Sequence, residues 1–180
     1  MTFYRLGLIG YPISHSVSPQ IHTAALKKAG LDGKYKLYPI APDDKQGLTD
    51  LLAQVRAGDI HGLNVTIPHK QNVMSLLDEL TPTAKAIGAV NTISLLNGRL
   101  VGDNTDAGGF WNDLQELMRP VRFSKPDRSS HALILGAGGS ARAVTYALLQ
   151  HGWDVTISAR RMKQAQSLIT HYGSPHITAT

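Results

Sequence analysis

The sequence predicts an α/β protein with a mostly parallel sheet, arranged as two units in series. Short apolar runs of strand length alternate with amphipathic stretches of helix length, which is the pattern of parallel strands joined by crossover helices. A polar stretch at residues 119–130 contains two prolines and has no hydrophobic period, so it marks a connection between the units. With 180 residues, the chain is long enough for one domain or two small ones.

The composition is that of an ordinary soluble protein and disfavours several classes of function. Apolar residues make up 42% of the chain and charged residues 17%, so disorder is not expected. The formal charge of +5 is scattered, which favours an anionic small substrate or a phosphate-bearing cofactor over nucleic acid. No run has membrane-spanning length and the first residues lack signal-sequence features, so we expect a cytoplasmic protein without a membrane partner.

Disulfides and metal sites are not expected. The chain has no cysteine, which leaves neither a disulfide framework nor thiolate ligands. Its eight histidines include no His-Glu-x-x-His arrangement, and His15 and His22 are too far apart to be adjacent helical ligands.

The first unit begins as strand, helix, strand, helix and strand. Ser18 followed by Pro19 predicts a helix start, because serine caps exposed amides and proline suits the first turn. Asn97-Gly98 predicts a hairpin turn. The expected elements are strands at 3–9, 35–40 and 60–65, helices at 18–28 and after 44 with Leu48, Leu51, Leu52 and Val55 on one face, short helices after 70 and from 81 to about 88, the two hairpin strands, and a helix ending near 118.

The second unit opens with a glycine-rich loop between a strand and a helix. A strand at 131–135 enters the loop, and a helix to about 150, a strand at 155–158, a helix at 162–172 and the start of a strand at 177–179 follow. Such a loop, with a second strand within about 30 residues, is the arrangement of a dinucleotide site. We therefore predict a partial Rossmann-type domain whose cofactor contacts are Gly136, Ala137, Gly138, Gly139, Ser140 and Ala141.

The end of the second strand of this unit indicates which dinucleotide binds. An acidic residue there holds the ribose of NAD, whereas arginine accommodates the phosphate of NADP. The residues present are Ser158, Ala159, Arg160 and Arg161, and Asp154 lies at the opposite end of the strand. The sequence therefore favours NADP, with a solvated arginine pair as the alternative interpretation.

Polar side chains in the first unit follow the ends of predicted strands, where open α/β sheets bind ligands. Thr66 and Lys70 come after the third strand, and a solvated lysine is the alternative interpretation. Ser14 and Ser16 precede a helix amino terminus and could face a carboxylate, although serines also occur in turns for their own hydrogen bonds.

Two further residues have both a structural and a functional interpretation. Asn91 lies in a strand, where an amide needs either a structural partner or a ligand hydroxyl. Asp106 could be an acidic residue in the first turn of a helix or a partner of Lys70.

Five sequence blocks together resemble the shikimate dehydrogenase family, and they extend over essentially the whole chain. The blocks are Gly10-x-Pro12-Ile13-x-His15-Ser16-x-Ser18-Pro19, Asn64-Val65-Thr66-x-Pro68-His69-Lys70, Gly88-Ala89-Val90-Asn91-Thr92, Gly102-x-Asn104-Thr105-Asp106-x-x-Gly109 and Gly136-Ala137-Gly138-Gly139-x-x-Arg142-Ala143. The resemblance implies a substrate domain at 1–104, a connecting helix and linker at 105–130 and a partial NADP domain at 131–180.

The resemblance also implies reversible, NADP-dependent reduction of 3-dehydroshikimate to shikimate in aromatic amino-acid biosynthesis. We expect the protein to be a monomer or a homodimer. Ser14 and Ser16 would hold the substrate carboxylate by this match. Thr66, Asn91 and Asp106 would contact ring hydroxyls, and Lys70 with Asp106 would form the catalytic pair.

The chain departs from the family pattern in two places. A late helix that carries a substrate-binding glutamine in the family has no counterpart, so we expect a fragment or a truncated form. The family often has Asn-Arg-Thr at the phosphate clamp, where this chain has Ala159-Arg160-Arg161. The alternatives are therefore an NAD-using quinate/shikimate dehydrogenase and a non-catalytic shikimate-binding module.

Overall fold

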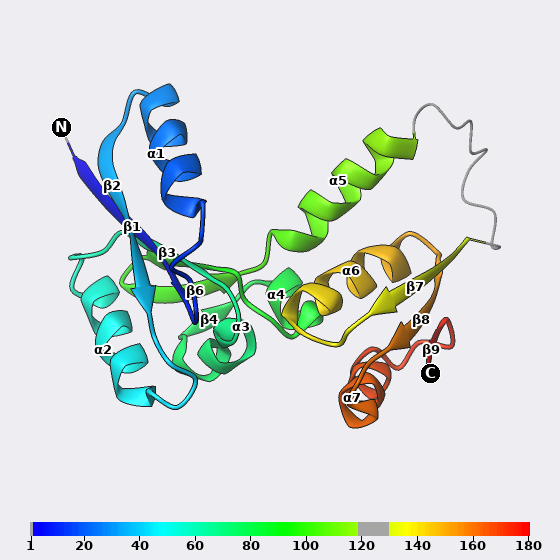
Figure 1. Cartoon of the computed structure of the whole chain (residues 1–180). Coiled ribbons are helices and arrows are strands. Elements are labelled where there is room, and N and C mark those ends of the chain that lie inside the picture. Colours follow the sequence, from blue (N-terminus) through cyan, green and yellow to red (C-terminus); the bar gives the residue numbers. More distant parts are fainter. Residues whose placement is uncertain (1, 119–129) are drawn as a thin grey trace. The chain divides into compact units, whose positions relative to one another are not determined.

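The computed structural model describes residues 2–118 and 130–180, which form two compact α/β units (Figure 1). The first unit comprises residues 1–85 and 89–104, and the second comprises residues 86–88 and 105–180. Most of the predicted connection at 119–130 lies outside the described residues. None of the described helices has the length and apolar character needed to cross a membrane.

The first unit contains one sheet in the order β2-β1-β3-β5-β6-β4. Strand β1 pairs in parallel with β2 and β3, β5 runs antiparallel to β3 and β6, and β4 is parallel to β6. The predicted α/β fold with a mostly parallel sheet is thus confirmed. The predicted hairpin turn between β5 and β6 is also present at Asn97 and Gly98, both of which have positive φ. The strands are β1 Phe3–Gly10, β2 Asp32–Pro39, β3 Gly62–Val65, β4 Glu79–Leu80, β5 Thr92–Leu96 and β6 Arg99–Asp103.

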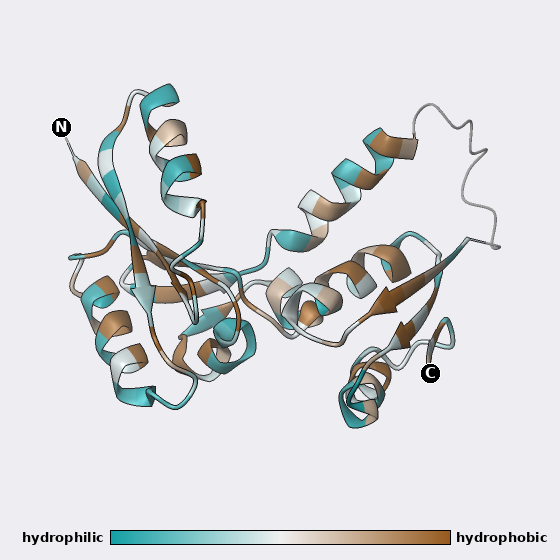
Figure 2. Cartoon of the chain, in the orientation of Figure 1, coloured by the Kyte–Doolittle hydropathy of each residue, from teal (hydrophilic) through white to brown (hydrophobic). Residues whose placement is uncertain are grey.

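The helices of this unit follow the predicted periodicity. Polar and apolar residues alternate around α2, whose predicted apolar face is buried in the main core with Ile9, Val65 and Ile93 (Figure 2). Asp44 caps α2 by accepting a hydrogen bond from the Gly47 amide at 2.8 Å. The helices are α1 Ser18–Lys28, α2 Lys45–Arg56, α3 His69–Asn72, the 3-10 helix η1 Val73–Leu76 and α4 Pro82–Ile87.

The predicted serine cap of α1 is wrong, although the helix begins where expected. The residue before the helix is Val17, and no side chain caps the amino terminus. Ser18 Oγ instead accepts a hydrogen bond from Ser16 Oγ at 3.0 Å and bonds to Tyr35. Its oxygen is therefore committed to the loop and to β2 rather than to the helix amides.

The second unit contains a parallel three-stranded sheet in the order β7-β8-β9. Its strand-helix-strand-helix-strand order confirms the predicted partial Rossmann-type fold. Val155, Ile157 and Leu168 are buried in its core, while Leu133 and Leu135 on β7 are exposed. The elements are α5 Asp106–Met118, β7 His131–Leu135, α6 Gly139–Gln150, β8 Asp154–Ser158, α7 Met162–Tyr172 and β9 Ile177–Ala179.

Candidate functional site

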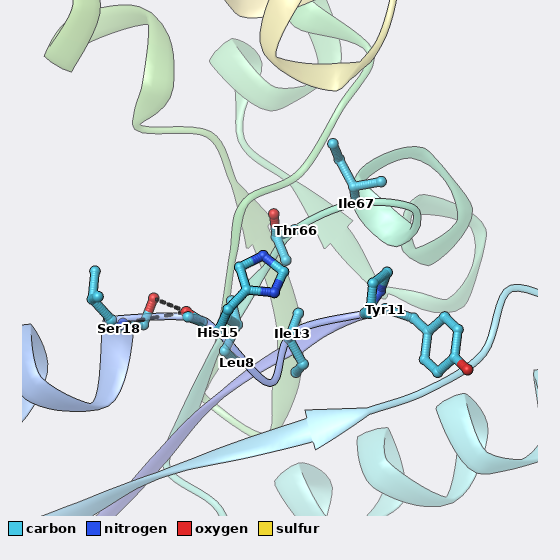
Figure 3. A pocket seen from close by; sticks show the side chains of 10 residues that line it. Leu8, Tyr11, Ile13, His15, Ser18, Thr66 and Ile67 are labelled. Atoms are coloured by element: carbon cyan, nitrogen blue, oxygen red, sulfur yellow. Dashed lines mark hydrogen bonds between the residues drawn. The ribbon is translucent and has the colours of Figure 1, made fainter.

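The first unit has a cavity of about 550 Å³ beside the carboxyl ends of β1 and β3. The parallel register pairs Ile9 with Val65, so the loops after both strands emerge at the same edge. The Thr66 amide donates to Ile9 O at 2.8 Å, which holds the two loops together. The cavity is lined by Leu8, Tyr11, Pro12, Ile13, His15, Ser16, Val17, Ser18, Thr66 and Ile67 (Figure 3).

The loop before α1 places two serine hydroxyls at this cavity. Ser16 Oγ donates to Ser18 Oγ at 3.0 Å and accepts from the Ser18 amide at 3.2 Å, as the dashed lines in Figure 3 show. Ser14 is exposed in the same loop but does not line the cavity. Of the residues predicted to contact substrate, the structure therefore brings Ser16 and Thr66 to the cavity.

Lys70 is 9% exposed on the short helix α3, and its backbone is held from several sides. The Val90 amide donates to Lys70 O at 2.7 Å, and the His69 amide donates to Thr66 O at 2.9 Å. The His69 ring is fully buried, with Nε2 2.7 Å from Ile40 O. These bonds fix the position of Lys70 relative to Thr66 and to the segment before β5.

Asn91 immediately precedes β5 and has structural partners. Its amide donates to Asp103 O at 2.9 Å and its carbonyl accepts from the Val65 amide at 2.8 Å. Its side-chain Oδ1 accepts from Thr92 Oγ1 at 3.0 Å. Asn91 therefore lies beside the end of β3, where it bonds to the residue just before Thr66.

Sequence reasoning missed Tyr35 and Asn64 behind the site. Tyr35 Oη donates to Asn64 Oδ1 at 2.8 Å, and the Tyr35 ring stacks on His22 with centroids 4.4 Å apart. Burial raises the pKa of Tyr35 to about 12, partly offset by its bond to Ser18, and burial lowers the pKa of His22. An asparagine within a strand was a readable signal, because the argument used for Asn91 applies equally to Asn64.

Asp106 is the first residue of α5 in the second unit, three residues after Asp103 at the end of β6. Lys70 belongs to the first unit, so the pairing of Lys70 with Asp106 stays a prediction. Within the first unit, the neighbouring Asn104 donates from Nδ2 to Ala89 O at 2.9 Å.

The glycine-rich loop of the second unit leaves open space at the amino terminus of α6. Gly136 has φ +122° and its amide donates to Ser158 O at 2.7 Å, which ties the loop to β8. No side chain caps α6, and apart from the adjacent residues of the chain no described atom lies within 4 Å of the position that a Cβ on Gly136 or Gly138 would take. A helix amino terminus with such space beside it fits the diphosphate of a dinucleotide.

The predicted phosphate clamp follows β8 directly. Arg160 and Arg161 are both exposed, and neither makes an ion pair within residues 2–118 and 130–180. Asp154 lies at the other end of β8, where its Oδ1 is 2.7 Å from His176 Nδ1. The described end of β8 thus presents cationic side chains and no carboxylate.

Comparisons with known proteins point to one family. Residues 8–93 match the shikimate dehydrogenase substrate binding domain. The chain is 41% identical over 165 residues to the NADP(+) shikimate dehydrogenase of Oceanobacillus iheyensis, covering 91% of the chain and 58% of that relative. The chain thus spans a little over half of the length of this relative.

Solved structures agree with this match. Shikimate 5-dehydrogenase of Thermus thermophilus, in complex with NADP(H) and shikimate, matches with a TM-score of 0.82 and 35% identity over 99% of this chain and 63% of that one. Quinate dehydrogenase of Corynebacterium glutamicum, in complex with NAD, matches with a TM-score of 0.82 and 30% identity over 99% and 64%.

Proposed function

We propose that the chain is a member of the shikimate dehydrogenase family and that it catalyses the reversible, NADP-dependent reduction of 3-dehydroshikimate to shikimate. The observation that carries this proposal is the segment from Asn64 to Lys70, which places Thr66 at the cavity and a buried lysine on the next helix. We place the reaction in the cytoplasm and in aromatic amino-acid biosynthesis, with the protein acting as a monomer or homodimer.

The first unit would hold the substrate through its polar groups. In the proposal Ser14 and Ser16 bind the carboxylate, while Thr66, Asn91 and Asp106 contact the ring hydroxyls. The hydroxyl of Ser16 and the side chain of Thr66 lie on the same cavity, whose volume of about 550 Å³ suits a small ring acid. As the sequence predicts, we propose that residues 1–104 form the substrate domain.

Lys70 would move the proton. When bound, NADPH would supply the hydride for the ketone carbon, and negative charge would then develop on the carbonyl oxygen. The Lys70 ammonium stabilises that charge and donates the proton that completes the hydroxyl group. In the reverse direction neutral Lys70 takes the hydroxyl proton, while Asp106 orients the lysine and accepts a hydrogen bond from the adjacent hydroxyl.

The second unit would bind the cofactor. In the proposal the diphosphate lies on the loop from Gly136 to Ala141, and Arg160 with Arg161 bind the ribose phosphate of NADP. NAD use is the second candidate, favoured by the likeness to a quinate dehydrogenase in complex with NAD. Arg160→Ala tests this choice, because it should raise the KM for NADP and leave NAD use unchanged.

The decisive measurement is nicotinamide absorbance on mixing the chain with shikimate and either NADP or NAD. Lys70→Ala should lower turnover by about a hundredfold or more with nearly unchanged shikimate affinity. Lys85→Ala, which removes an exposed lysine from α4, is the matched control. Near-normal turnover in Lys70→Ala would remove this lysine from the mechanism, and shikimate binding without turnover in the unaltered chain would favour a non-catalytic binding module.

A further inference from the structure

Residues 86–88 complete helix α4 and lead toward β5, and they belong to the second unit although the residues on both sides belong to the first. The last turn of α7 makes one of the contacts responsible. His171 Nε2 is 2.8 Å from Ala86 O, and because a carbonyl oxygen only accepts, this ring nitrogen carries the hydrogen. A side chain 85 residues further along the chain thus donates to the carboxyl end of α4.

Gly88 fits closely against both α6 and α7. It has φ +70°, and a Cβ on it would lie 2.9 Å from Arg142 Nη1 on α6 and 3.1 Å from His171 Cε1 on α7. Tyr172 Oη donates to Arg142 O at 2.8 Å, which joins the end of α7 to the first turns of α6. Residues 86–88 are therefore held by both helices together, within the second unit.

Both of these helices begin at segments that we propose to bind NADP. Helix α6 starts within the loop from Gly136 to Ala141, and α7 starts directly after Arg160 and Arg161. The Gly136 amide donates to Ser158 O, so the loop is also tied to the strand that leads into α7. A bound dinucleotide would therefore restrict both helices that hold residues 86–88.

The chain continues from Gly88 directly into backbone that supports the proposed substrate site of the first unit. Asn104 Nδ2 donates to Ala89 O at 2.9 Å, and the Val90 amide donates to Lys70 O at 2.7 Å. The bond to Lys70 thus lies two residues after the glycine that α6 and α7 hold. Any restriction of residues 86–88 reaches the proposed catalytic lysine through these two residues.

We propose that His171 is a positioning residue that couples the two ligands, so that NADP bound to the second unit strengthens the binding of shikimate to the first. This inference rests on the proposed function. When the cofactor has already ordered residues 86–88, shikimate binding has less backbone left to order beside Lys70. The coupling is reciprocal, so shikimate strengthens the binding of NADP by the same factor.

The test is calorimetry of shikimate binding to the chain, with and without saturating NADPH. These two ligands cannot react with each other, because both are in the reduced form. In the unaltered chain NADPH should strengthen shikimate binding by about fivefold or more. His171→Ala should bind shikimate alone as the unaltered chain does and should lose most of this gain, whereas His171→Gln, whose amide can donate to Ala86 O, should retain it.

His176→Ala is the matched control, since it also removes a hydrogen-bonded histidine from the second unit. His176 Nδ1 is 2.7 Å from Asp154 Oδ1, and this bond does not involve residues 86–88, so the variant should keep the full gain. A gain that persists in His171→Ala, a gain lost equally in His176→Ala, or independent binding of the two ligands to the unaltered chain would overturn the coupling role. An unaltered chain that binds neither shikimate nor NADPH would overturn the proposed function, and this inference with it.

Discussion

Substituting Gly10 by alanine should lower the free energy of unfolding of the first unit, because the end of β1 leaves no room for a methyl group. A Cβ at Gly10 would lie 2.4 Å from Thr66 Cγ2 and 2.7 Å from Ile13 Cγ2, well inside ordinary contact distance. The backbone cannot easily withdraw, since Gly10 O accepts from the Ile40 amide at 3.2 Å and Ile9 O accepts from the Thr66 amide at 2.8 Å.

The cost follows from the number of neighbours that must shift. Overpacking a well-filled core by one methyl group costs about 2 kcal/mol, equivalent to a fall in Tm of about 10 °C for a unit of this size. Because Thr66 must move away from Gly10, shikimate binding should weaken in Gly10→Ala as well. The matched control is Gly138→Ala, where apart from the adjacent residues of the chain no described atom lies within 4 Å of the added methyl and the expected loss is below about 1 kcal/mol.

Urea unfolding separates the two units, because both tryptophans, Trp111 and Trp153, belong to the second one. Gly10→Ala should lower the midpoint followed by circular dichroism, with a smaller change in tryptophan fluorescence. Gly138→Ala should leave stability nearly unchanged and weaken NADP binding, since its methyl group occupies the space proposed for the diphosphate. A Gly10→Ala protein as stable as the unaltered chain would refute the close packing of β1 against Thr66.

Three further predictions concern stability. Burial lowers the pKa of His22 below its ordinary value of 6.5, so the unfolded state binds more protons than the folded state. The free energy of unfolding should therefore fall as the pH drops below about 6.5. Urea titrations at pH 7.5 and 5.5 should show a smaller loss of this free energy in His22→Phe than in the unaltered chain. Arg56 lowers the pKa of Asp78 from 3.8 to about 2, so the stability that this carboxylate supplies should be lost as pH falls through that window. In Asp78→Asn the free energy of unfolding should depend less on pH in this acidic range. Asp44→Ala, which removes the cap bonded to Gly47, should lower the free energy of unfolding by about 1 kcal/mol in urea titrations, and an unchanged midpoint would contradict the capping role.

Periodicity predicted the fold well wherever a segment buries one face. Leu48, Leu51, Leu52 and Val55 recur at helical spacing and are all buried in the structure. The hairpin was readable because Asn97 and Gly98 tolerate positive φ. Local pattern carries such elements because their burial and their backbone geometry are decided within a few residues.

Elements and partners that depend on distant residues were not readable in the same way. Strand β4 consists only of Glu79 and Leu80, too short to show a period, and it exists through its pairing with β6. The serine cap was wrong because Ser18 has a competing partner in Tyr35, which is 17 residues away in the sequence. Sequence propensity favours hydrogen bonds to nearby backbone groups and contains no information on a partner that comes close only when the sheet has folded.

The two halves differ in how their polar groups are satisfied, and this difference bears on the order of binding. In the first unit Ser16, Asn64 and Asn91 already bond to other protein groups, so the substrate site is organised before a ligand arrives. In the second unit the first turn of α6 has no side-chain cap and faces open space. The positive end of the helix dipole lies at this space, so the energetic gain from a bound diphosphate should be concentrated there. Shikimate should therefore bind the chain in the absence of NADP, because the groups proposed to recognise it are already positioned without the cofactor.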